Sequence, residues 1–309
     1  MTALPSPACP TVSAIYTAYE AAADHGFRAH LGASLIGTEC ERAIWYSFRW
    51  ATRARHTGRL LRLFDTGNLA EARFVADLRR IGVTVLDVDP ASGRQWNMRD
   101  ASGHFGGSMD AVVIGLPEAP ATWHVCEFKT HSAKSFAKLK ADGVAVSKPL
   151  HWAQMQAYMQ LAGLDRAFYL AVCKDTDELY QERIPHDAEA GLRILAKAER
   201  IIGAARPPAR ISQDPAWWQC RFCDHHAVCH AGAAPERHCR SCLHASPVQG
   251  GDCHCARHSV PLDRREQEAG CAAHLYLPDF VAAEQIDAGE DWVSYRLPDG
   301  TEWRDGVPA

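Results

Sequence analysis

Two short apolar segments joined by a tight turn constrain this chain most, because each carries charged residues at defined places. The first begins with Asp110, and the second, residues 123–129, contains Glu127 and Lys129. Residues 115–117, Gly-Leu-Pro, are typical of a hairpin turn between them. Alternate side chains of a strand share a face, so Glu127 and Lys129 point the same way. We therefore predict that Asp110 lies alongside Glu127 and completes a two-carboxylate cation site.

Such a site suits metal-dependent hydrolysis of a phosphodiester. Carboxylate oxygens hold Mg²⁺ or Mn²⁺, and the metal polarises the phosphate and helps to generate hydroxide. Lys129 can orient that water or stabilise charge that develops on phosphorus. A Glu-x-Lys triplet also recurs by chance on ordinary surface strands, where the lysine is only an ion-pair partner. Neighbouring features must decide between the two interpretations.

Three neighbouring features favour the catalytic interpretation. Gly106-Gly107-Ser108 leads Asp110 out of a flexible turn into its strand. Glu71, on a predicted helix, supplies a third carboxylate. Gln154 and Tyr158 lie four residues apart on a later predicted helix and hence on one face, where they can bind phosphate or brace the metal site.

The spacing of apolar residues predicts alternating helices and strands. We expect helices over residues 12–26, 38–50, 67–80, 133–141, 149–161 and 187–205. We expect strands over residues 83–88, 110–114, 123–129, 167–173 and 178–184. Mixed in this order, they indicate an α/β fold with a small mixed sheet flanked by helices. Residues 292–303, around Pro298-Asp299-Gly300, predict a terminal β-hairpin.

Composition bears mainly on compartment and cysteine chemistry. The 309 residues, 47 % apolar and 23 % charged, are ordinary for a soluble globular protein. They include no run long and apolar enough for a bilayer and no secretory signal, so we expect a cytoplasmic protein without a membrane partner. In that reducing compartment twelve cysteines, eight of them between Cys220 and Cys271, point to metal rather than disulfides.

The first cysteine group has three members close together: Cys220, Cys223 and Cys229. A fourth ligand must come from elsewhere, and Cys40 is the candidate, although alone it is more typical of a buried core thiol. Such a set suits tetrahedral zinc or a four-iron four-sulfur cluster, and spacing does not choose between them. If the metal is zinc, three histidines are alternative ligands: His225, His226 and His230.

The second group lies nearer the end of the chain and has seven members: Cys239, Cys242, Cys253, Cys255, His258, Cys271 and His274. Close cysteine pairs separated by a loop indicate zinc, but a structural zinc takes only four ligands. The four that we predict are Cys239, Cys242, Cys255 and Cys271. We accordingly expect a catalytic domain over residues 1–232 and a Cys/His-rich module with the hairpin over residues 233–309.

Over about residues 30–230 the chain resembles the RecB-like nucleases of the restriction-endonuclease-like, PD-(D/E)xK, superfamily. Their pattern runs from an acidic or His residue on a helix to Asp, Glu-x-Lys and Gln-x-x-x-Tyr. The resemblance implies metal binding by Glu71, Asp110 and Glu127, with catalysis assisted by Lys129, Gln154 and Tyr158. Glu71 departs from the many members that carry His at its position.

The iron-sulfur branch of this family has one cysteine before the nuclease core and three after it, and this chain is similar at all four positions. The resemblance therefore implies a structural four-iron four-sulfur cluster on Cys40, Cys220, Cys223 and Cys229, with zinc as the alternative. It further implies a Mg²⁺- or Mn²⁺-dependent deoxyribonuclease, an exonuclease acting on ends or single strands in DNA repair, recombination or phage replication. The module after residue 232 lies outside the resemblance.

Cations and aromatic residues before and after the site suggest a DNA surface. Phosphates can be contacted by the basic stretch from Arg42 to Arg62 and by Lys134, Lys138, Lys140 and Lys148. Four aromatic residues can stack on the bases of a single strand, although core positions explain any one of them as well: Trp45, Tyr46, Trp50 and Trp152. A competing hypothesis is a nuclease-like protein that binds DNA or recruits a helicase or recombinase without turnover. A redox iron-sulfur protein is a third, disfavoured because no second electron-transfer motif is visible.

Overall fold

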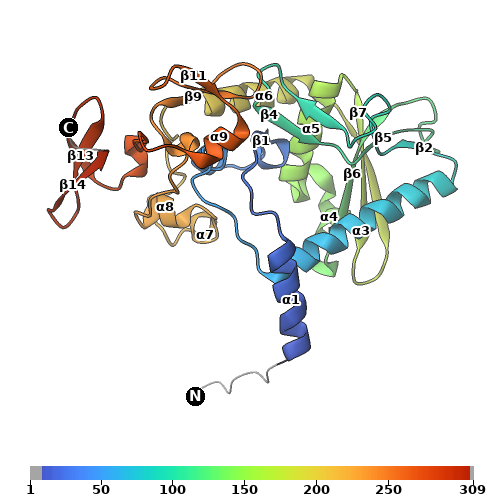
Figure 1. The fold of residues 1–309 in the computed structure, drawn as a ribbon. Coiled ribbons are helices and arrows are strands. Elements are labelled where there is room, and N and C mark those ends of the chain that lie inside the picture. The colour runs from blue at the N-terminus through green and yellow to red at the C-terminus, as the bar shows by residue number, and fades with distance from the viewer. Residues whose placement is uncertain (1–8, 307–309) are drawn as a thin grey trace.

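A five-stranded mixed sheet forms one end of the molecule in the computed structural model, which describes residues 9–306 (Figure 1). The strand order is β2-β5-β6-β7-β8, with β6 and β7 parallel and the other neighbours antiparallel. The strands are β2 (Thr84–Leu86), β5 (Ala111–Ile114), β6 (His124–His131), β7 (Arg166–Cys173) and β8 (Leu179–Pro185). This confirms the predicted mixed α/β architecture.

Helices cover both faces of the sheet. A parallel strand pair needs a crossover, and α4 (Ala133–Ser147) and α5 (Pro149–Ala162) supply it between β6 and β7. Proline at its first position starts α5, and Gly163, at φ +64°, ends it as predicted. Across the other face runs α3 (Gly58–Arg80), which packs Phe74 and Leu78 against the sheet. Figure 1 shows α3 in front of β6 and α4 behind it.

The remaining helices frame this sandwich. They are α1 (Pro10–Ala22), α2 (Glu41–Phe48) and α6 (Ala188–Gly203). The Asp187 side chain caps α6 by accepting the backbone N–H of Ala190 at 2.9 Å, as its position predicts. Two predicted boundaries are wrong: α3 begins nine residues earlier than Gly67, and α1 ends at Ala22 before Gly26. The two helices pack together, with Tyr19 donating to Asp65, which explains the longer α3.

A second small sheet lies beside the five-stranded sheet and orders the approach to Asp110. Its strands are β1 (Leu31–Gly32), β4 (Phe105–Ser108) and β3 (Asn97–Arg99), with η1 (Ala33–Leu35) following β1. Gly106, at φ +152°, approaches β3 so closely that a Cβ there would lie 1.9 Å from the Met98 carbonyl oxygen. The glycine pair before Asp110 is thus a packing requirement of β4.

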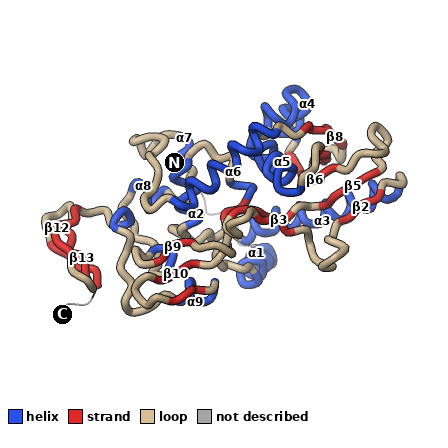
Figure 2. The backbone as a smooth tube through the Cα atoms, turned by 90° about the horizontal axis from the view of Figure 1, so that it is seen from above, coloured by secondary structure: helices blue, strands red, loops and turns tan. Residues whose placement is uncertain are grey.

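The C-terminal part of the described chain contains only short elements, at the end of the molecule opposite the five-stranded sheet (Figure 2). The helical turns are α7 (Trp218–Arg221), α8 (His226–His230), η2 (Cys239–Ser241), α9 (Arg264–Ala269) and η3 (Pro278–Phe280). The strands form two sheets: β9 (Ala245–Pro247), β10 (Cys253–Cys255) and β11 (Val260–Leu262), then β12 (Glu284–Ala288), β13 (Trp292–Arg296) and β14 (Glu302–Gly306). The predicted hairpin is β13-β14, extended by β12.

Polar contacts join this C-terminal part to the core. Arg240 donates to the Ala29 carbonyl oxygen at 2.9 Å, and the backbone N–H of Gly250 donates to Ser102 at 3.0 Å. The exposed pair Arg53–Glu236, at 2.8 Å, lies at the same junction. Within residues 9–306 no helix is long and apolar enough to cross a bilayer.

Candidate active site and two thiol clusters

The β5-β6 ladder brings Asp110 to Glu127. Ala111 pairs with Cys126, so the residue before β5 stands opposite the residue after Cys126. Beyond this point β6 continues without β5 beside it, so the Phe128 N–H has no backbone partner on that side. The Asp110 carboxylate takes that place, accepting the Phe128 N–H at 2.7 Å. The predicted pairing of Asp110 with Glu127 is confirmed, whereas the connection between the strands, residues 115–123, is longer than the predicted turn at residues 115–117.

Glu127 lies fully buried between two other predicted site residues. The Lys129 ammonium is 2.5 Å from Oε1, and the Gln154 amide donates to Oε2 at 3.2 Å. Gln154 reaches the strand because it lies on the face of α5 that covers the sheet. Lys129 keeps 28 % of its side chain exposed, so the pair opens toward solvent on the lysine side.

Burial and mutual repulsion dominate the electrostatics of the site. Burial raises the pKa of Glu127 to about 7, with Lys129 opposing the rise and Asp110 adding to it. The pKa of Asp110 is raised by burial, and that of Glu71 by burial and then by Asp110. Burial alone would lower the pKa of Lys129, but Glu127 and Asp110 outweigh it and raise the pKa. Three carboxylates therefore share one ammonium.

Tyr158 is turned toward protein atoms. Its buried hydroxyl donates to the Ser108 carbonyl oxygen at 2.8 Å, just before Asp110. A Cβ at Gly107 would lie 2.6 Å from the Tyr158 hydroxyl oxygen, so a larger residue there would displace this buried hydroxyl. Of the two alternatives left by the sequence, phosphate binding or bracing, the observed contacts favour bracing for both Gln154 and Tyr158.

The donor chemistry fits a divalent cation, since an excess of buried carboxylates is stabilised by added positive charge. The described residues nevertheless contain no three His, Cys, Asp or Glu side chains arranged to hold a metal ion. Both Glu127 oxygens are engaged, one by Lys129. Binding of a cation through Oε1 therefore requires Lys129 to turn away.

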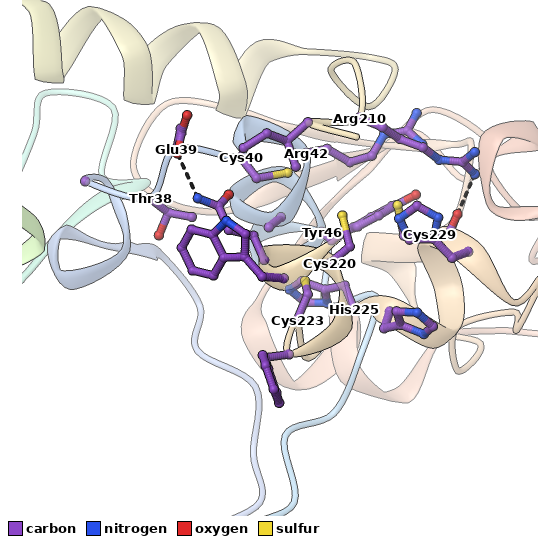
Figure 3. A pocket seen from close by; sticks show the side chains of 18 of the residues that line it. Thr38, Glu39, Cys40, Arg42, Tyr46, Arg210, Cys220, Cys223, His225 and Cys229 are labelled. Atoms are coloured by element: carbon purple, nitrogen blue, oxygen red, sulfur yellow. Dashed lines mark hydrogen bonds between the residues drawn. The ribbon is translucent and has the colours of Figure 1, made fainter. Parts of the chain in front are cut away.

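The first cysteine group lines one cavity of about 600 Å³. Its four cysteines are Cys40, Cys220, Cys223 and Cys229, and Figure 3 shows them around the same space. Cys40 precedes α2, Cys220 lies in α7 and Cys229 in α8. Burial raises the pKa of the Cys220 thiol, and the neighbouring Cys229 and Cys40 raise it further. Tertiary structure thus brings the two ends of the predicted set together.

Two of the three histidines near this cavity have hydrogen-bond partners. His225 Nε2 lies 2.9 Å from Ser47 Oγ, and burial lowers its pKa to about 4. His226 Nε2 lies 3.3 Å from the Pro215 carbonyl oxygen. His230, which lies against the His226 ring at 5.4 Å, lines the cavity together with the four thiols.

The second cysteine group is also drawn together. Cys239 packs with Cys253 and Cys255 in a buried cluster. Burial raises the pKa of Cys239 to about 12, and Cys242, Cys271, Cys255 and Cys253 follow in that order as further causes. The three other predicted ligands and Cys253 thus all act on Cys239. His274 is bonded to Ser241 Oγ at 3.0 Å, which assigns it a structural contact.

Three of the four predicted base-stacking aromatics are wrong, and the fourth, Trp152, is half-buried against the core. Trp45, Tyr46 and Trp50 are at most 2 % exposed, because their rings complete the core between the early helices and the C-terminal part. Trp50 stacks on Phe27 at 4.9 Å. Arg49 is buried as well and donates to Ala245. Much of this early stretch is therefore structural.

Sequence reasoning missed three polar residues beside Lys129: His131, His151 and Tyr169. A signal existed for two of them. His131 lies two residues after Lys129, on the same face of the strand. His151 lies three residues before Gln154, on the same side of its helix.

Comparison with known proteins identifies the family. The model of the PD-(D/E)XK nuclease superfamily matches residues 12–230, more than half of the chain. The chain belongs to this superfamily. Its members typically use a divalent metal ion, in agreement with the donor chemistry of the carboxylate site. The match spans the first cysteine group and ends before the second.

Solved structures show only a distant likeness. SSO0001 is 13 % identical over 72 % of this chain and 98 % of its own, with a TM-score of 0.41. The alkaline exonuclease LHK-Exo from Laribacter hongkongensis is 17 % identical over 60 % of this chain and 90 % of its own, with a TM-score of 0.41. The structure of LHK-Exo in complex with dAMP is 15 % identical over 61 % of this chain and 89 % of its own, with a TM-score of 0.40. No curated protein matches the chain.

Proposed function

We propose that this protein is a Mg²⁺- or Mn²⁺-dependent DNA nuclease, an exonuclease of repair, recombination or phage replication. The observation that carries the proposal is the convergence of Asp110, Glu127 and Lys129 at the open edge of β6. Superfamily membership adds the reaction class, phosphodiester hydrolysis.

The proposed roles follow from the contacts of each residue. Asp110 and Glu127 would hold the cation, and Glu71 is the third carboxylate beside them. A bound divalent ion supplies Lewis-acid polarisation of the phosphate and a more acidic water. Lys129 has a flexible, partly exposed stem, so its ammonium can turn from Glu127 toward a phosphate oxygen or the water. There its charge stabilises negative charge that develops on phosphorus. Gln154 holds Glu127 in place during this exchange.

Cleavage assays on matched substrates test the proposal. Linear single-stranded and duplex DNA, labelled at one end, and circular DNA of the same sequence separate exonuclease from endonuclease activity. We expect Mg²⁺- or Mn²⁺-dependent loss of the linear substrates, abolished by Asp110→Asn and by Lys129→Ala. Arg193→Ala, an exposed arginine on α6 paired with Glu189, is the matched control. If the wild-type protein binds DNA without cleaving it, and Asp110→Asn binds DNA equally well, the competing recruitment hypothesis is favoured.

We also propose that the first cysteine group binds a four-iron four-sulfur cluster, with zinc as the alternative. The support is one cavity lined by four thiols, which suits either tetrahedral metal or a cluster. Its role would be structural, joining Cys40 to segments about 180 residues later. Anaerobic purification, an absorbance spectrum and metal analysis test it. A brown protein with about four irons supports the cluster; a colourless one with zinc supports the alternative.

For the second group we propose a structural zinc on Cys239, Cys242, Cys255 and Cys271. The mutual influence of these thiols supports it. Cys253 is the comparison variant, because it comes last among the thiols that raise the pKa of Cys239, and its own pKa shift is caused, after burial, by Arg240, Arg49 and Asp252. We expect Cys239→Ser to lose zinc and Cys253→Ser to keep it. We further propose a boundary near residue 232 between the nuclease domain and this module.

A further inference from the structure

A chain of hydrogen bonds runs near Lys129, from Lys148 between α4 and α5, through β6 and β7, to the first turn of α5. Lys148 Nζ donates to Ser135 Oγ at 2.7 Å, and Ser135 Oγ lies 3.3 Å from His131 Nδ1. His131 Nε2 is 2.8 Å from the Tyr169 hydroxyl oxygen. The same oxygen is 2.9 Å from His151 Nδ1.

One arrangement of protons uses every donor of this chain within it. An ammonium can only donate, so the Ser135 hydroxyl accepts from Lys148, and its own proton is available to His131 Nδ1. Neutral His131 then carries its proton on Nε2 and donates it to the Tyr169 oxygen, and the Tyr169 hydroxyl donates to His151 Nδ1. In this arrangement His151 carries its proton on Nε2.

Both imidazoles are held neutral. Burial, followed by nearby lysines, lowers the pKa of His131 to about 4. Burial, followed by Lys129, lowers the pKa of His151 to about 3. His151 also lies in the first turn of α5, where the partial positive charge of the helix disfavours an imidazolium and favours an anion. A neutral N–H donor in a positive environment suits an anionic ligand.

The Nε2 of His151 is the free end of the chain. Within residues 9–306 it has no hydrogen-bond partner, and it is not among the buried unpartnered atoms, so it reaches solvent. Tyr169, which His151 contacts, pairs with Glu127 in the parallel β6-β7 ladder. Gln154, one turn after His151 on α5, donates to Glu127. The donor therefore belongs to the neighbourhood of the carboxylate site.

We propose that His151 Nε2–H binds a phosphate oxygen of the DNA strand held at this site, and that Tyr169, His131, Ser135 and Lys148 lock the required tautomer. The inference rests on the proposed nuclease function and adds a phosphate contact to it. His151 would touch the substrate, whereas Tyr169 and His131 are positioning residues.

Binding of a 5′-labelled single-stranded oligonucleotide in Ca²⁺, followed by fluorescence anisotropy, tests the contact without cleavage. We expect His151→Ala to raise the Kd about tenfold, the usual loss for a hydrogen bond to a charged group. His151→Asn retains an N–H donor and should recover part of the affinity. Tyr169→Phe should weaken binding less than His151→Ala. Tyr180→Phe should not change binding, because it removes a hydroxyl that donates to Glu182 on the same strand, β8.

Nitrogen chemical shifts of the histidine rings give a second readout that does not depend on activity. We expect the Nε2–H tautomer at both His131 and His151 in the wild type, and a mixture at His151 in Tyr169→Phe. The Nδ1–H tautomer at His151, or unchanged Kd and kcat/KM in His151→Ala, would overturn the inference. If Asp110→Asn still abolishes cleavage in that case, the proposed function stands without it.

Discussion

The carboxylate site and the first thiol cavity are built in opposite ways. Asp110 and Glu127 lie on adjacent strands, and their oxygens accept hydrogen bonds from Phe128 and Gln154. The four thiols come from the start of α2 and from the short turns α7 and α8, separated by more than 170 residues of sequence. The first site is held by a β-ladder, whereas the second is held by short segments with little regular structure.

The difference teaches where a bound group contributes to folding. A ladder supplies its own hydrogen bonds, so the carboxylates can be brought together without a cation, at the cost of repulsion. Helical turns of four or five residues are not stable alone. A metal or cluster at the thiol cavity would therefore contribute much of the stability of its surroundings.

The largest expected effect is on catalysis at the ladder. Asp110→Asn should reduce cleavage by roughly a thousandfold or more, since it removes a metal ligand. It should leave the melting temperature unchanged or higher, because the variant loses a buried charge whose pKa is raised by burial. Asp177→Asn, an exposed aspartate paired with Arg73, is the control. Initial rates and thermal melts check this. A melting temperature of Asp110→Asn well below that of the wild type would show that the carboxylate also stabilises the ladder.

The thiol cavity should behave in the reverse manner. Cys220→Ser should lose the bound metal and roughly 3 kcal/mol or more of unfolding free energy, as expected when a structural metal site is removed. Cys173→Ala, at a buried thiol on β7 outside the cavity, should keep the metal. Metal analysis and urea unfolding check both variants. Equal stability of wild type and Cys220→Ser would show that the cavity folds without its ligand.

A pH titration sharpens the comparison on the ladder side. The pKa of His131 is lowered to about 4, mainly by burial, so between pH 4 and 6.5 the unfolded chain binds more protons there than the folded one. This contribution is full above pH 6.5 and is lost as the pH falls toward 4. His131→Gln should flatten the fall in urea midpoint over that window, relative to wild type. Equal slopes in wild type and His131→Gln would contradict the assignment.

The smallest effect is expected at Tyr158. Tyr158→Phe removes one hydrogen bond, to Ser108, and should cost about 1 kcal/mol of stability. As a brace for Asp110 it should lower kcat by about tenfold or less and leave KM unchanged. A rise in KM with constant kcat would instead indicate a phosphate contact. Steady-state kinetics at saturating metal distinguish the two.

Local patterns predicted much of the fold because short-range physics decides them. Strand alternation and the turn placed Asp110 beside Glu127, and Pro149 and Gly163 marked the ends of α5. The start of α3 was missed because its first turns are set by packing against α1. The same holds for Trp45 and Trp50: aromatic rings near arginines suit a DNA surface or a core equally, and only their neighbours decide.

The sequence by itself determined which donor groups exist and which of them share a strand or helix face, because periods of two and of 3.6 residues are local properties. It thereby determined the carboxylate pair, the lysine beside it and the superfamily. Only the tertiary structure decided that Cys40 lines the same cavity as Cys220 and that Tyr158 donates to Ser108 of β4. It also decided that two histidines share the hydroxyl of Tyr169. Those contacts join residues far apart in the chain, and the packing of the whole molecule, rather than any local preference, fixes the distances between them.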